Sequence, residues 1–150
     1  MGFTAVNAAD STHPPAPDRS AERGLSETDA DSTDTQLERM TAELGVLAQY
    51  VASLSASSDL RRHPELCAQL RRAALEALAS VCNASEEPSG PIRRREGLRA
   101  LGALYELDVI SRIARHIQAL RSSEAERLSD MRRRATRLLR ACIGTPGDYV

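Results

Sequence analysis

From about residue 35 onward, apolar residues recur among polar ones at the spacing of an α-helix. In the first such segment they are separated by alternating steps of three and four residues: Leu37, Met40, Leu44, Leu47, Val51 and Leu54. These steps place a single apolar stripe on one face of a helix. We expect this helix to begin at Thr35, since Thr35 and Glu38 have the spacing of a capping box, and to end within residues 55–59.

A second helix is expected from Pro64 to about Ala84. Proline suits the first turn of a helix, because the N–H that it lacks would have no partner there. The positions expected to face inward are Leu66, Leu70, Ala73, Ala74, Ala77, Leu78 and Val81. Residues 86–91, Glu-Glu-Pro-Ser-Gly-Pro, combine two prolines with a glycine and predict a loop.

The third segment, from about Ile92 to Leu120, has apolar residues on two adjoining faces of a helix. One face carries Leu98, Leu101, Tyr105 and Val109, and the other carries Leu104, Leu107, Ile110, Ile113, Ile117 and Leu120. A stripe this wide predicts that the helix is buried on more than one side.

The fourth segment begins at a second capping-box sequence, Ser123–Glu126, and is expected to end at Gly144 and Pro146. Its inward positions are Leu128, Met131, Ala135, Leu138, Leu139 and Cys142. Four helices of about 20–29 residues with short connections, and no strand-like alternation, predict an all-α protein. The predicted fold is an antiparallel up-down four-helix bundle over residues 35–144, followed by a short C-terminal tail, residues 145–150.

Residues 1–34 differ from the rest of the chain in composition and charge. They are rich in Ala, Ser, Thr, Asp and Pro and have no apolar periodicity, so we expect a disordered acidic tail. Residues 1–40 carry eight acidic residues and three arginines, whereas residues 41–150 carry 13 acidic residues and 17 arginines. The formal net charge of −1 therefore conceals a mildly basic bundle behind an acidic segment.

Composition excludes several classes of function. With one Phe, three Tyr and no Trp, the chain lacks the rings that all-β sandwiches and base-stacking modules require. All 20 basic residues are arginine, which excludes a phosphate-binding lysine of the P-loop kind. Cys67, Cys82 and Cys142 form no CxxC pair, and neither a signal peptide nor a membrane span is evident, so we expect a cytoplasmic protein.

Arginines gather in three places. Arg71 and Arg72 lie in the second helix, and Arg93, Arg94 and Arg95 begin the third, where the helix dipole disfavours cations and an anionic partner would favour them. The fourth helix has five arginines within nine residues, with only Asp130 close by in the sequence: Arg132, Arg133, Arg134, Arg137 and Arg140. Such a row could follow the phosphates of a nucleic acid. The ordinary interpretation is a solvated helix surface.

Acidic residues of the third helix suggest a polar contact rather than catalysis. Glu106, Asp108 and Arg112 could form a network inside the bundle or between subunits, or Asp108 and Arg112 could form an intrahelical ion pair worth about 0.3–0.5 kcal/mol. The three histidines are isolated, and no set of residues has metal-ligand spacing. We therefore expect no enzymatic activity, no cofactor and no metal.

Two stretches resemble a known family. Residues 69–74, Gln-Leu-Arg-Arg-Ala-Ala, are similar to the QLRRA signature of the four-helix-bundle proteins encoded in intervening sequences of bacterial large-subunit rRNA genes. Residues 93–108 resemble the family's third helix with its basic start, and residues 122–127 occupy the place of its turn into helix four. The resemblance covers about residues 37–143, but the family's proline and closing glycine after QLRRA are missing here. The chain also resembles the related accessory variability determinant of diversity-generating retroelements.

The resemblance implies a function that the composition alone does not. It implies a homo-oligomeric ring, a pentamer in the retroelement branch, that binds a reverse transcriptase and its template RNA and supports mutagenic cDNA synthesis without catalysis. The residues that it assigns to nucleic-acid or polymerase contacts are Arg71, Arg72, Arg93, Arg94, Arg95 and the arginines of the fourth helix. A protein-interaction adaptor or chaperone-like bundle is the alternative, and a di-metal enzyme, which would need a bound metal, is a third.

Overall fold

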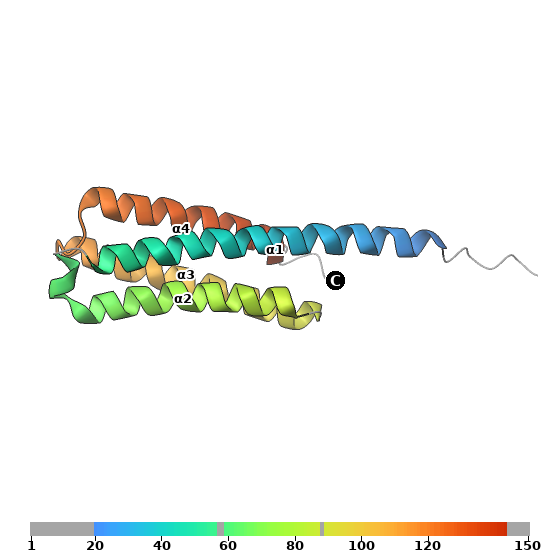
Figure 1. Cartoon of the computed structure of the whole chain (residues 1–150), viewed down its shortest axis with the longest axis horizontal. Helices are drawn as coiled ribbons and strands as arrows, with labels where there is room; N and C mark the ends of the chain where they lie inside the picture. Colours follow the sequence, from blue (N-terminus) through green and yellow to red (C-terminus); the bar gives the residue numbers. More distant parts are fainter. Residues whose placement is uncertain (1–19, 57–58, 88, 144–150) are drawn as a thin grey trace, which may run out of the picture.

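The structure is a computed structural model that describes residues 20–56, 59–87 and 89–143, with side chains described from residue 34 onward. Four α-helices make up almost all of this part of the chain: α1 (Ser20–Ser55), α2 (Pro64–Glu86), α3 (Gly90–His116) and α4 (Ser122–Ile143). A single 3-10 turn, η1 (Leu60–Arg62), joins α1 to α2. The helices run alternately in opposite directions (Figure 1), which confirms the predicted four-helix bundle.

The order of the helices around the bundle follows their order in the chain. Helix α1 packs against α2 and α4, and α3 packs against the same two neighbours. Helices α2 and α4 therefore lie diagonally across the bundle, and side chains on their outward faces belong to different surfaces.

The core confirms the predicted inward positions of α1, all of which are buried. Helix α2 contributes mainly small side chains, among them the buried Ala73, Ala74 and Ala77, and α3, which packs against α2, also buries Ala100 and Ala103. Small residues at a helix–helix contact allow the two backbones to approach closely. Larger side chains from α1, α3 and α4 fill the remaining space of the core.

The start of α1 differs from the prediction. The helix begins at Ser20, so the capping-box sequence at Thr35 lies within it, and the backbone of residues 20–34 is helical where we expected disorder. No proline follows Pro17 in this stretch, and a capping box favours a helix start without preventing a helix from extending further. The first part of α1 extends beyond the other helices (Figure 1). Residues 1–19 of the expected tail lie outside the described residues.

The turn between α3 and α4 also departs from the prediction. Helix α3 ends at His116 rather than near Leu120, because Gln118 adopts a left-handed conformation with φ of 60° and the N–H of Ala119 then donates to the Ala114 carbonyl at 2.8 Å. Helix α4 begins at Ser122, where the Glu124 carboxylate accepts a hydrogen bond from the backbone N–H of Arg121 at 2.9 Å. Glu124 thus takes the capping role that we assigned to Glu126. The predicted helix end at Gly144 and Pro146, and the tail 145–150, lie outside the described residues.

Large apolar side chains from both predicted faces of α3 are exposed: Leu98, Tyr105 and Val109 from the first, and Ile113 and Ile117 from the second. At steps of seven and four residues they lie along one side of the helix. Our expectation that α3 is buried on more than one side is therefore wrong for one subunit taken alone. The periodicity indicated that this face is apolar, but it could not indicate whether the bundle itself covers the face.

Candidate nucleic-acid interface

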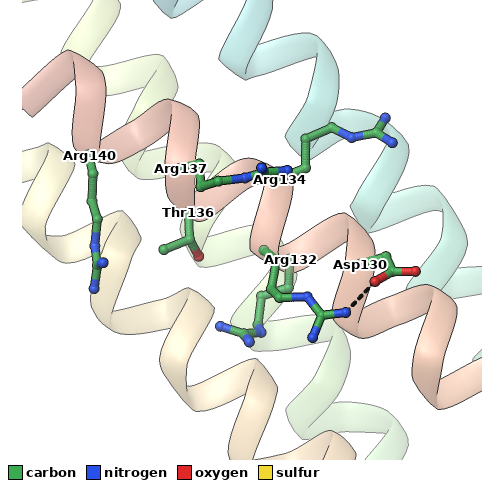
Figure 2. A pocket seen from close by; sticks show the side chains of 7 residues that line it. Asp130, Arg132, Arg134, Thr136, Arg137 and Arg140 are labelled. Carbon is green, nitrogen blue, oxygen red and sulfur yellow. Dashed lines mark hydrogen bonds and ion pairs between the residues drawn. The ribbon is translucent and has the colours of Figure 1, made fainter.

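A hollow of about 530 Å³ lies along the outer side of α4, and arginines make up most of its wall (Figure 2). The residues that line it are Asp130, Arg132, Arg133, Arg134, Thr136, Arg137 and Arg140. Arg133, Arg137 and Arg140 recur at steps of four and three residues and are exposed, as the sequence predicted. All five predicted arginines of the fourth helix therefore meet in one place.

Three of these five arginines are neutralised by carboxylates. Arg133 forms an ion pair with Asp130, Arg132 Nε lies 3.1 Å from Asp108 Oδ1 of α3, and Arg134 Nη1 lies 3.8 Å from Glu43 Oε2 of α1. The sequence suggested only Asp130 as a counter-charge, because Asp108 and Glu43 are distant along the chain. This part of the prediction overestimated the charge of the row.

The other two arginines have no carboxylate partner in the described part of the chain. Arg140 donates a hydrogen bond to the neutral phenol oxygen of Tyr105 on α3, and Arg137 has no ion pair among the described residues. Five arginines against three carboxylates leave an excess of at least two positive charges at the hollow, because Asp108 also pairs with Arg112. This excess attracts anions, and its effect falls with ionic strength because the side chains are exposed.

Asp108 is the centre of a partly buried ion-pair network that joins α3 to α4. Its side chain is 14% exposed and that of Arg132 is 12% exposed, while Arg112, at 76% exposed, places Nη2 2.7 Å from Asp108 Oδ2. The Arg132 Nε–H has no hydrogen-bond partner, although the nitrogen is close to the carboxylate. The attraction between Arg132 and Asp108 is therefore Coulombic rather than a well-directed hydrogen bond.

Glu106 belongs to a different network from Asp108 and Arg112. It forms an ion pair with Arg72 of α2. Glu76 of α2 joins the same network: its Oε2 lies 3.7 Å from Arg72 Nη1, and its Oε1 lies 3.3 Å from Arg99 Nε. The structure therefore divides the predicted set of Glu106, Asp108 and Arg112 between two sides of α3. Both networks lie within one subunit.

The arginines of α2 and of the start of α3 do not share the surface of the α4 hollow. Arg71 is exposed and its Nε donates to the Cys67 carbonyl at 3.4 Å, but α2 is diagonal to α4. At the start of α3, Arg93 donates to the Glu87 carbonyl at 3.1 Å and pairs with Asp34 at 3.5 Å, and Arg95 pairs with Glu96 at 3.5 Å. These local acceptors offset the unfavourable helix dipole that we had taken as a sign of an anionic partner. The Nε atom of Arg94 is buried without a hydrogen-bond partner.

Two residues near α4 were missed by the sequence analysis. Thr136 is 8% exposed and lines the hollow, yet its hydroxyl has no hydrogen-bond partner. Tyr50 of α1 donates to the Glu124 carbonyl at 3.4 Å, and the guanidinium of Arg127 lies 4.8 Å from the centre of its ring. Burial raises the pKa of Tyr50, an effect that Arg127 opposes and Glu124 reinforces. Thr136 lies four residues from both Arg132 and Arg140, and this spacing was its only sequence signal.

The chain matches no protein-family model, no curated protein and no solved structure. No helix in the described part of the chain is both long and apolar enough to cross a membrane. Within residues 20–56, 59–87 and 89–143, no three His, Cys, Asp or Glu residues lie where they could together hold a metal ion.

Proposed function

We propose that this protein is a non-enzymatic accessory protein of a diversity-generating retroelement, which binds the reverse transcriptase and template RNA and supports mutagenic cDNA synthesis. The observation that carries the RNA-binding part is the α4 hollow, where Arg137 and Arg140 have no carboxylate partner among the described residues. The resemblance of residues 69–74 and 93–108 to the bundle family supports the retroelement context.

Binding at such a hollow would be electrostatic. Guanidinium groups form charge-assisted, often paired hydrogen bonds to phosphate oxygens, and phosphate contacts carry no sequence information directly. No aromatic residue is among the described residues that line the hollow, and Tyr105 of α3 accepts a hydrogen bond from Arg140 at its edge. We therefore expect RNA binding with little preference for base sequence.

The test is RNA affinity measured by fluorescence anisotropy over a range of salt concentrations. The variant Arg137→Gln with Arg140→Gln should bind RNA at least tenfold more weakly than the wild type at low salt. The matched control is Arg61→Gln with Arg62→Gln, which removes the same charge from two exposed arginines of η1. Equal loss in both double variants would indicate non-local attraction, and no RNA binding by the wild type at low salt would refute the RNA part of the proposal.

A second candidate function, a protein-interaction adaptor, is favoured by the exposed apolar face of α3. A contiguous exposed apolar surface is typical of a protein contact. Within the retroelement proposal this face is available to the polymerase or to further copies of the chain, and the resemblance implies five copies. If the adaptor function is correct, Arg137→Gln with Arg140→Gln leaves partner binding intact while Val109→Asp abolishes it. Light scattering on the purified protein gives the number of subunits.

A further inference from the structure

The hydroxyl of Thr136 has an unusual environment for a threonine within a helix. A threonine or serine at such a position can donate to the carbonyl four residues earlier, as Thr41 does to Leu37 at 3.0 Å and Ser55 does to Val51 at 2.9 Å. The Thr136 hydroxyl has no hydrogen-bond partner among the described residues, although the residue is only 8% exposed. Buried polar groups in folded proteins are almost always paired, so an unpaired one requires an explanation.

The surroundings of Thr136 are cationic. Arg132 and Arg140 lie one helical turn before and after it, and Arg137 is its neighbour in the chain (Figure 2). Arg132 also has a buried Nε–H without a hydrogen-bond partner, beside the Asp108 carboxylate. Two buried donors without hydrogen bonds and two guanidinium groups without carboxylate partners among the described residues therefore belong to residues that line one hollow.

We propose that Thr136, Arg137 and Arg140, with Arg132 behind them, form a binding site for a single phosphate group. The excess of two positive charges matches the one or two negative charges of a phosphodiester or phosphate monoester. Arg140 would exchange the neutral oxygen of Tyr105 for an anionic oxygen, which makes a stronger, charge-assisted bond. The Thr136 hydroxyl oxygen is covered in the structure, so phosphate binding would also have to expose it.

This site deepens the proposed function: its ligand chemistry is independent of that function, and only the source of the phosphate rests on it. If the protein binds RNA, the group is a backbone phosphodiester. If it does not, the same donors serve a free phosphate monoester. Both sources present the same oxygens to the same four side chains, so the site can be tested with inorganic phosphate alone.

The experiment uses the full chain, observed by NMR through threonine methyl groups and arginine Nε–H groups, with inorganic phosphate as the probe. We expect saturable shifts at Thr136, Arg137 and Arg140. The variant Thr136→Val keeps the shape but removes the hydroxyl, and should weaken phosphate binding at least threefold, while Thr136→Ser should retain it. Thr41→Val, which removes a hydroxyl already bonded within α1, is the control and should bind phosphate like the wild type. Thermal melting of each variant identifies any loss of fold.

The outcomes separate the site from the proposed function. Weaker binding of both phosphate and a short RNA by Thr136→Val supports the site and the phosphodiester as its ligand. Weaker binding of phosphate alone supports a site for a free phosphate monoester and counts against the RNA interface at α4. Unchanged phosphate binding by Thr136→Val, or shifts confined to other arginines, overturns the site, even if Arg137→Gln with Arg140→Gln still weakens RNA binding and so upholds the proposed function.

Discussion

Replacing Asp108 by asparagine tests whether the partly buried ion-pair network holds α3 and α4 together. The substitution keeps the shape of the side chain and removes the negative charge that compensates Arg132, whose side chain is 12% exposed. Removing one partner of a buried ion pair typically costs about 3–5 kcal/mol, because the remaining charge stays desolvated. The Arg132 Nε–H makes no hydrogen bond to Asp108, so we expect a loss at or just below the lower end of this range, about 2–3 kcal/mol.

The second partner of Asp108 provides the matched control. Arg112 is 76% exposed, and exposed ion pairs contribute about 0–1 kcal/mol, so Arg112→Gln should cost less than about 1 kcal/mol. The double variant Asp108→Leu with Arg132→Met replaces the pair by apolar side chains and should recover most of the stability lost in Asp108→Asn. Urea unfolding followed by circular dichroism gives the free energies of unfolding. If Asp108→Asn and Arg112→Gln cost the same small amount, the network does not join the two helices.

Three further substitutions test the packing and electrostatics of the bundle. Leu44→Ala should lower the free energy of unfolding by about 2–5 kcal/mol, because Leu44 is fully buried, and urea unfolding measures this loss. Gly97→Ala should destabilise the protein by about 1–3 kcal/mol, because the added Cβ would lie 2.7 Å from Ile143 Cγ1. At Gly102 an added Cβ has no neighbouring atom within 4 Å, so Gly102→Ala should stabilise the helix by about 0.5–1 kcal/mol. Melting temperatures that shift equally in the two variants would refute this contrast. The raised pKa of Tyr50 means that the folded protein favours the neutral phenol. The stability that this contributes is complete below the unfolded pKa near 10 and is lost as the pH rises through the folded pKa. Tyr50→Phe should remove this fall in the free energy of unfolding between about pH 9 and 12, and absorbance at 295 nm follows the ionisation.

The fold could be predicted from the sequence where spacing alone determines the structure. The steps of three and four residues in α1 leave a single face for burial, and the six apolar residues of that face, from Leu37 to Leu54, are buried as expected. The start of the same helix could not be predicted, because the local capping preference at Thr35 does not oppose a helix that continues to Ser20. For α3, the spacing indicated an apolar face, but spacing cannot indicate that the other helices of the chain leave Val109 on that face exposed.

The candidate site was predictable only in part, for a similar reason. The positions of Arg133, Arg137 and Arg140 on one face follow from helical geometry, and the structure places them in one hollow. The neutralisation of Arg132 and Arg134 depends on carboxylates from α3 and α1, which only the packing of the helices brings near. The unpaired hydroxyl of Thr136 is likewise a property of the folded chain. The sequence does not indicate that this hydroxyl makes no hydrogen bond to the carbonyl four residues earlier.

The small charge excess at the hollow determines how an RNA interface on this protein would have to work. If Arg137 and Arg140 share the single phosphate proposed above, each subunit makes one phosphate contact, and each contact with single-stranded RNA changes the slope of log K against log salt by about −0.7. One subunit acting alone should therefore give a slope of about −0.7 and weak binding, whereas a slope of about −1.4 would mean that the two arginines bind separate phosphates. A ring of five subunits that all engage one RNA through shared-phosphate sites would give a slope of about −3.5, with affinity gained through multivalency rather than through any new contact. A slope that stays at the single-subunit value at every protein concentration would separate RNA binding from self-association, whereas a steeper slope that appears only for the oligomer would show that the α4 hollows act together.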